Sequence, residues 1–140
     1  MGYTTRGYKG AKLEYSRALI DTSIIIDYLR KQNKQKSEFW RLMNEYECAI
    51  STITLFELYS GAKNKQQKED VDTLRAYLEV IAFDDRQAKE ASKIFQTLKK
   101  QNRLIEFRDI FIASCAITKQ IPIATLNIDH FERIEDIQLL

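Results

Sequence analysis

Short apolar runs alternate with longer stretches of helical period along this 140-residue chain. The runs fit buried strands and lie at residues 18–20, 48–50, 80–83 and 122–125, with a further short one at 137–140. Between them, apolar residues at helical spacing predict helices at about 22–30, 37–46, 52–61, 71–78, 84–100 and 108–119, with a polar connection at 63–68. Alternation at these lengths is typical of a parallel sheet with helices on both faces. We therefore predict an α/β fold, a three-layer α/β/α sandwich around a central parallel sheet.

Residues that suit helix ends support several of these boundaries. Thr22 or Ser23 can cap the first helix, and Thr52 is a suitable N-cap for the third. Gly61 suits a left-handed stop at the end of that third helix.

The chain is long enough for one domain with a sizeable core, which we place at residues 18–140. Residues 1–17 hold three of the four glycines and no apolar period, which indicates an N-terminal extension or leader outside the fold. No apolar run approaches the roughly 20 residues that a membrane span needs. Cys48 and Cys115 stand among apolar neighbours, outside any metal-binding spacing, so we expect two unpaired thiols. A cytoplasmic protein without a membrane segment is the expectation.

Three acidic residues in apolar surroundings lie where strands give way to helices. Asp21 follows the first strand directly, Glu57 lies about one turn into the helix after the second, and Asp109 begins a later helix. Thr125 and Asn127 lie at the end of the fourth strand and just after it. Ligands of parallel α/β sheets bind beyond the carboxyl ends of the strands. We therefore expect these five side chains to meet at one edge of the sheet.

A group of carboxylates needs a positive partner. Buried anions without a counter-charge are unfavourable and raise one another's pKa values. Oxygen ligands favour Mg²⁺ or Mn²⁺, and the sequence lacks the Cys and His clusters that zinc prefers. Such ions polarise phosphates and activate water. The pattern indicates a divalent-metal site suited to hydrolysis of a phosphodiester.

Four motifs frame these residues: ALIDTSIIIDYL at 18–29, ISTITLFELYSG at 50–61, RDIFIASCA at 108–116 and IATLNIDHF at 123–131. In this order they resemble the PIN-domain ribonucleases, and most of all the VapC toxin branch of that family. The likeness covers residues 18–140. It implies a small α/β/α sandwich and a Mg²⁺- or Mn²⁺-dependent endoribonuclease that cleaves RNA as the toxin of a type II toxin-antitoxin system. It also implies a VapB-like antitoxin as inhibitory partner and a homodimer.

The resemblance assigns roles position by position. Asp21, Glu57 and Asp109 match the acidic triad, which makes them the expected catalytic residues and metal ligands. Asn127 matches a fourth site in the motif, and Thr125 matches the hydroxyl residue that supports the first aspartate.

Five further residues leave alternatives open. Asp129 is the other candidate for the fourth site, and Glu106 adds a carboxylate whose direction the sequence does not define. Lys63 and Arg108 could contact RNA phosphates or could be solvated surface charges, and the net charge of +2 does not decide between them. His130, the only histidine, could act as a general base, but we favour a packed or surface ring.

Other functions fit less well. A phosphoacceptor domain should carry adjacent acids after its first strand, and a haloacid-type phosphatase needs an aspartate where this chain has Ser23. Two alternatives stay open: a PIN-domain nuclease that processes RNA and is no toxin, and a catalytically inactive RNA- or protein-binding module of the same fold. We also predict a groove for an amphipathic antitoxin segment, formed by apolar positions of the third and fourth helices: Leu55, Leu58, Tyr59, Leu74, Tyr77 and Leu78.

Overall fold

The computed structural model describes residues 16–140, so most of the predicted extension, residues 1–15, lies outside the described residues. The first strand begins one residue earlier than predicted, at Arg17. The Ser16 carbonyl accepts a hydrogen bond from the Glu47 amide at 3.0 Å. Arg17 also forms an ion pair of 2.8 Å with Glu79, two strands away. The last residues of the predicted extension therefore belong to the folded domain.

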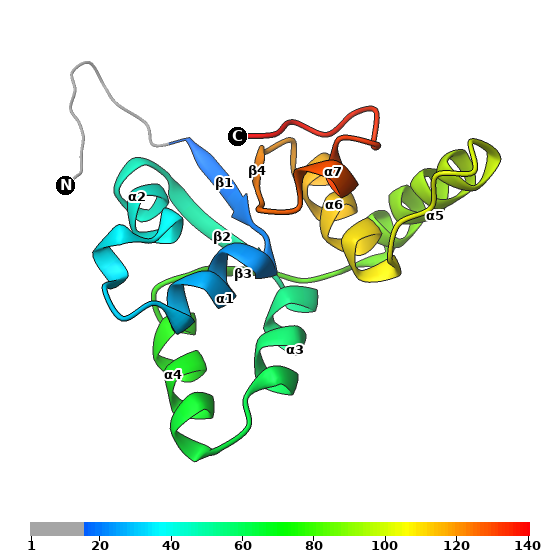
Figure 1. The fold of residues 1–140 in the computed structure, drawn as a ribbon. Coiled ribbons are helices and arrows are strands. Elements are labelled where there is room, and N and C mark those ends of the chain that lie inside the picture. The colour runs from blue at the N-terminus through cyan, green and yellow to red at the C-terminus, as the bar shows by residue number, and fades with distance from the viewer. Residues whose placement is uncertain (1–15) are drawn as a thin grey trace.

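Strands and helices alternate along the chain (Figure 1). The strands are β1 (Arg17–Ile20), β2 (Glu47–Ser51), β3 (Glu79–Ile81) and β4 (Ile123–Ala124). The helices are α1 (Thr22–Arg30), the 3-10 helix η2 (Lys34–Lys36), α2 (Glu38–Glu45), α3 (Thr52–Gly61), α4 (Lys65–Arg75), α5 (Asp85–Lys100), α6 (Phe107–Lys119) and α7 (Ile128–Phe131). Between residues 16 and 140, no helix combines the length and the apolar character needed to cross a membrane.

The strands form one sheet in the order β3-β2-β1-β4, and every pair is parallel. Leu19 of β1 lies opposite Ala49 of β2 and Ile123 of β4, which sets the register at the centre. Because all strands run the same way, their carboxyl ends share one edge. The neighbours of β1 come from distant parts of the chain, so the connections diverge at its carboxyl end, where such sheets bind ligands.

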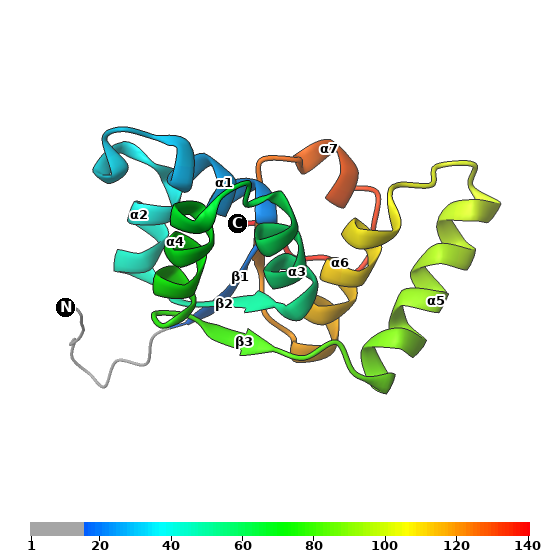
Figure 2. The ribbon, with the colours of Figure 1, turned by 90° about the horizontal axis from the view of Figure 1, so that it is seen from below.

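Alternate residues of the strands enter two separate cores on the two faces of the sheet. Leu19 and Ala49 join the core formed with α5, α6 and α7. Ile20 and Ile50 join the other core, formed with α1, α2, α3 and α4. Figure 2 shows α1, α2 and α4 on one side of the strands, and α5 and α6 on the other. The predicted three-layer α/β/α sandwich with a central parallel sheet is confirmed.

The ends of α3 differ from the prediction. Ser51, not Thr52, is the N-cap, and its Oγ accepts a backbone hydrogen bond of 3.0 Å. Since Ser51 is also the last residue of β2, the chain turns from strand to helix without a loop. The helix ends at Gly61 without a left-handed stop, because the following Ala62 is extended. A left-handed C-cap occurs instead at Gln120, with a φ of 58°.

The fourth helix and the chain end also depart from the prediction. Helix α4 already begins at Lys65, within the expected polar connection, and Asn64 caps it. Leu58, Leu74 and Leu78 are buried in the core, and of the six positions predicted for the antitoxin groove Leu58 alone lines the open groove between α1, α3 and α4. Tyr77, predicted to lie in the fourth helix, follows the end of α4 and is 77% exposed. At the chain end, the predicted strand at 137–140 is reduced to an isolated bridge between Ile123 and Leu139.

Candidate active site

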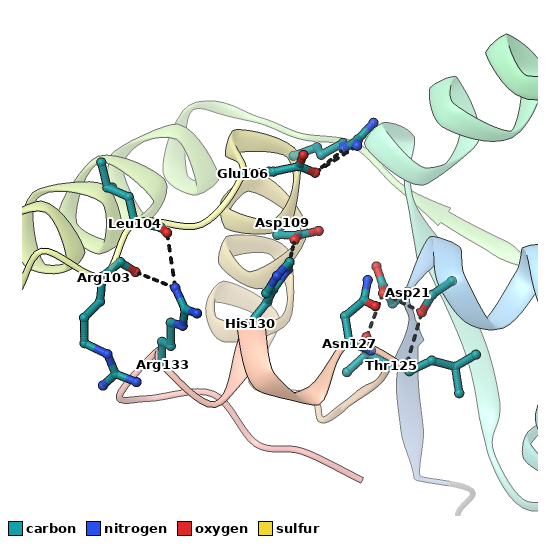
Figure 3. A network of polar contacts seen from close by, with 12 residues as sticks. Asp21, Arg103, Leu104, Glu106, Asp109, Thr125, Asn127, His130 and Arg133 are labelled. Atoms are coloured by element: carbon teal, nitrogen blue, oxygen red, sulfur yellow. Dashed lines mark hydrogen bonds and ion pairs between the residues drawn. The ribbon is translucent and has the colours of Figure 1, made fainter.

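The carboxyl edge of the sheet brings three acids into one neighbourhood, and Figure 3 shows two of them, Asp21 and Asp109. Asp21 follows β1 as the N-cap residue of α1, Glu57 lies along α3, and Asp109 lies in the first turn of α6. Asp21 is 2% exposed and Asp109 is 7% exposed. Helices α3 and α6 pack against each other. Burial first, and then the nearby charge of Asp21, raises the pKa values of both Glu57 and Asp109. The three carboxylates are therefore electrostatic neighbours.

Two hydroxyl groups fix one oxygen of Asp21. Thr125 Oγ1 donates to Asp21 Oδ2 at 2.7 Å, and Ser23 Oγ donates to the same oxygen at 2.8 Å. Ser23 accepts from the Leu126 amide at 3.0 Å, and Thr125 accepts from the Asn127 amide at 2.9 Å. The turn after β4 therefore holds the carboxylate at the end of β1. Ser23, a predicted helix cap, instead uses its hydroxyl on Asp21.

Both oxygens of Glu57 have a polar partner, one a hydrogen-bond donor and the other an ion-pair partner. Thr22 Oγ1 donates to Oε1 at 2.6 Å, and Arg108 Nε lies 3.2 Å from Oε2. Burial raises the pKa of the Glu57 carboxyl, the Thr22 hydrogen bond and Arg108 lower it, and the charges of Asp21 and Asp109 raise it further. The net effect is a rise, so one hydroxyl and one guanidinium do not fully compensate this carboxylate.

Asp109 is held by the only histidine. Nδ1 of His130, on α7, lies 2.9 Å from Asp109 Oδ2, and Figure 3 shows the ring reaching toward α6. Burial raises the pKa of Asp109, and the hydrogen bond with His130 offsets only part of that rise. The ring is 42% exposed. The ring is therefore partly exposed and bonded to Asp109. The predicted packed or surface ring does not include this contact.

The two candidates for the fourth position, Asn127 and Asp129, are both exposed. Asn127 is the N-cap residue of α7, and its amide donates to Thr125. Figure 3 shows the Asn127 side chain directed toward Asp21. This direction favours Asn127 over Asp129 for the fourth position.

The two basic residues predicted to contact RNA lie on the Glu57 side of the site, Arg108 in contact with Glu57 and Lys63 in the same groove. Lys63 lines an open groove of about 280 Å³ that also includes Glu57. Arg108 pairs with Glu106 at 2.8 Å as well as with Glu57 at 3.2 Å. Glu106, whose direction the sequence left undefined, therefore faces Arg108.

The donor set has the chemistry of a site for a hard divalent cation. It consists of carboxylate oxygens with the amide of Asn127 nearby, and such oxygens bind Mg²⁺ and Mn²⁺. A cation would also reverse the rise in the pKa values of Glu57 and Asp109. As the side chains stand, no three Asp, Glu, His or Cys residues in the described part of the chain can hold one ion together. Glu57 is turned to Arg108 and Asp109 to His130, so a shared ion requires these side chains to turn.

The sequence does not identify three partners of the acids. The sequence indicates a helix cap for Thr22, an RNA contact or a solvated surface charge for Arg108, and a packed or surface ring for His130. The only signals are positional: Thr22 follows Asp21, and His130 lies one helical turn after the predicted fourth site. Which acid each one contacts depends on how α3, α6 and α7 meet.

Known proteins are similar to this chain in sequence and in fold. Residues 18–137 match the PIN domain family. Ribonuclease VapC1 from Methanocaldococcus jannaschii is 34% identical over 131 residues, which cover 94% of this chain and 90% of that protein. The structure of VapBC-1 from nontypeable Haemophilus influenzae superposes with a TM-score of 0.77 at 29% identity, covering 89% of this chain and 96% of that one. VapBC2 from Rickettsia felis, bound to a DNA fragment from its promoter, gives a TM-score of 0.75 at 25% identity, covering 89% and 97%.

The fold and the site define an α/β/α domain with an acidic, oxygen-lined centre at the carboxyl edge of its parallel sheet. The chain belongs to the PIN domain family. Within that family it is similar to the VapC ribonucleases over nearly its whole length, so the resemblance seen in the four motifs is confirmed.

Proposed function

We propose that this protein is a Mg²⁺- or Mn²⁺-dependent endoribonuclease and the toxin of a VapBC-like toxin-antitoxin system. The observation that carries the proposal is the grouping of Asp21, Glu57 and Asp109 at the carboxyl edge of a PIN-domain sheet. Similarity to proteins named ribonuclease VapC supports RNA as the substrate.

In this proposal Asp21, Glu57 and Asp109 hold the ion, and Asn127 completes the site. Asp21 needs no rearrangement of its own, because the hydroxyl of Thr125 and a second hydroxyl already orient it. The chemistry that Mg²⁺ or Mn²⁺ supplies when bound is activation of water and stabilisation of negative charge on the phosphate and the leaving oxygen. Attack of water on phosphorus breaks the bond to the 3′ oxygen. The products then carry 5′-phosphate and 3′-hydroxyl ends.

Mutation of the acids tests this assignment. Asp21→Asn or Asp109→Asn should abolish RNA cleavage, while the metal-free protein stays as stable as the wild type or gains stability, because like charges no longer repel. Asp27→Asn is the matched control. Asp27 lies on α1, the helix whose N-cap residue is Asp21, and it pairs with Lys31 at 3.2 Å. Full activity of a folded Asp21→Asn variant would refute the proposed site.

Metal removal and product analysis test the chemistry. Cleavage should stop in EDTA and return with Mn²⁺ or Mg²⁺. His130→Ala should slow it by no more than about tenfold, because Asp109 exchanges its contact with the ring for the ion and the ring does not act as the base. Cyclic-phosphate ends, or cleavage that persists in EDTA, would assign the reaction to other residues.

Lys63 and Arg108 are the proposed contacts to RNA phosphates. Arg108 lies 3.2 Å from Glu57 and Lys63 lines the same groove as Glu57, so they can neutralise phosphates near the scissile bond. Lys63→Ala should raise KM with little change in kcat, because it removes binding that is equal in the ground and transition states.

A VapB-like antitoxin is the proposed partner. The open groove between α1, α3 and α4 has apolar walls that include Ile26, Leu29 and Val71, and charges of both signs line it: Arg30, Glu57, Lys63 and Asp70. An amphipathic antitoxin segment with basic and acidic residues would complement this mixture. Expression of the protein alone should arrest growth, and co-expression of the adjacent antitoxin gene should restore it. Growth unaffected by high expression would favour the RNA-processing alternative.

We further propose a cytoplasmic homodimer. Phe56 on α3 and Phe107 on α6 are 69% and 61% exposed, and the two helices pack together. A second copy could cover these rings. Light scattering after size exclusion should give twice the chain mass, and Phe56→Ser should shift it toward the monomer.

A further inference from the structure

Arg108 stands where a helix disfavours a positive charge. It is the second residue of α6, close to the positive end of the helix dipole. Two acids surround its guanidinium group. Nη2 lies 2.8 Å and Nε 3.1 Å from Glu106 Oε1, and Nε lies 3.2 Å from Glu57 Oε2. Arg108 therefore links the N-cap residue of α6 to the acid that α3 contributes to the site.

We propose that Arg108 is a built-in counter-ion that competes with the divalent cation for Glu57, and that Glu106 retains Arg108 when the cation binds. The inference rests on the proposed function, because it presupposes that Glu57 is a metal ligand. It assigns to Arg108 the role of setting the metal affinity of the site, in addition to any contact with RNA.

The three side chains differ in their freedom to move. The Glu57 side chain is 14% exposed, whereas those of Arg108 and Glu106 are 56% and 60% exposed. The guanidinium can therefore leave Glu57 and keep its hydrogen bonds to Glu106 without any change in the backbone. Glu57 stays in the site.

The two polar partners of Glu57 respond differently to a cation. Thr22 is neutral and bonds to Oε1, and a carboxylate oxygen has more than one acceptor position, so this hydrogen bond can persist. Arg108 is positive and repels a divalent ion at short range. The contact that the cation must displace is the one between Arg108 and Glu57.

Binding of Mn²⁺ alone, measured by titration calorimetry or by the electron paramagnetic resonance of free Mn²⁺, tests this without RNA. Arg108→Gln should lower the Mn²⁺ dissociation constant about threefold to tenfold, since it removes a competing ion pair and a nearby positive charge. Glu106→Gln should raise the dissociation constant, because Arg108 then has only Glu57 as a partner. If Glu106 acts through Arg108, its effect should disappear in the Arg108→Gln background.

Arg103→Gln is the matched control. It removes the same charge from the loop before α6, and Figure 3 shows the exposed Arg103 side chain directed away from Asp109. At 0.1 M salt the control should change the Mn²⁺ dissociation constant by less than about twofold. Equal tightening by Arg103→Gln and Arg108→Gln would mean that only net charge matters, and would overturn the inference.

Thermal unfolding gives a second readout. In EDTA, Arg108→Gln should melt below the wild type, because Glu57 loses its counter-ion, and Mn²⁺ should raise its Tm by more than it raises that of the wild type. If the wild type binds Mn²⁺ and the Arg108→Gln variant binds it no more tightly, this inference alone is overturned. A wild type that binds no Mn²⁺ overturns the proposed function and this inference with it.

Discussion

The hydroxyl of Thr125 is expected to matter both for stability and for metal binding. Thr125 is 9% exposed, and its Oγ1 donates to Asp21 Oδ2 at 2.7 Å. Thr125→Val keeps the shape and removes this hydrogen bond to a charged group, which is worth about 2 kcal/mol. A domain of this kind has a free energy of unfolding of about 5 to 15 kcal/mol, so the variant should still fold. Its Tm should fall by about 6 °C.

The functional loss should be larger in proportion than the loss of stability. Mutation of a residue that orients a metal ligand typically lowers metal affinity or activity about 10-fold to 100-fold. The Mn²⁺ dissociation constant should therefore rise, and the cleavage rate fall, by that much. Thr125→Ser keeps the hydroxyl and should recover most of the Mn²⁺ affinity. Thr118→Val is the control, because Thr118 Oγ1 donates only to the Cys115 carbonyl within α6, at 3.2 Å. If the Thr125→Val variant is as stable as the wild type, and its Mn²⁺ dissociation constant and cleavage rate change threefold or less, the role of Thr125 is refuted.

Three further predictions concern the stability of the fold. Lys34 Nζ donates to the carbonyls of Tyr28, Leu29 and Lys31 at 2.7 to 3.0 Å, so Lys34→Met should lower the free energy of unfolding by about 1 to 2 kcal/mol in urea titrations. Phe39 is fully buried, and Phe39→Ala should cost about 3 to 5 kcal/mol in the same assay. Burial raises the pKa of Cys48 to about 12 and that of Cys115 to about 11, so both thiols should stay protonated in the fold at pH 8. They should react with a disulfide reagent far more slowly in the native protein than in urea; equal rates would contradict the burial.

The placement of the acids could be predicted because it depends on local patterns. A short apolar run that ends in Asp21 indicates a buried strand with a polar residue at its carboxyl end. Glu57 follows the second such run at a distance that places it inside the next helix. In a parallel sheet both ends must share an edge, so topology brings the two together without any knowledge of their side-chain contacts.

Other features depend on contacts between elements, which no local pattern encodes. The apolar spacing that includes Tyr77 extends the predicted fourth helix, but the chain must leave α4 at Arg75 so that Glu79 can open β3 beside β2. Pairing in the sheet overrides the helical period there. In the same way, the contact of Arg108 with Glu57 follows from the packing of α3 on α6, and sequence spacing does not determine it.

The partners of the three acids divide the site into a fixed part and an adjustable part. Asp21 is held by neutral hydroxyls from its own helix and from the turn after β4, and these can stay in place whatever charge arrives. Glu57 and Asp109 are held partly by Arg108 and His130, which carry or can carry a positive charge and stand in competition with a cation. A carboxylate that keeps its position offers the incoming ion an oriented first ligand. The other two can then exchange their partners for the ion, so metal affinity should respond to changes at Arg108 without any change in the geometry of Asp21.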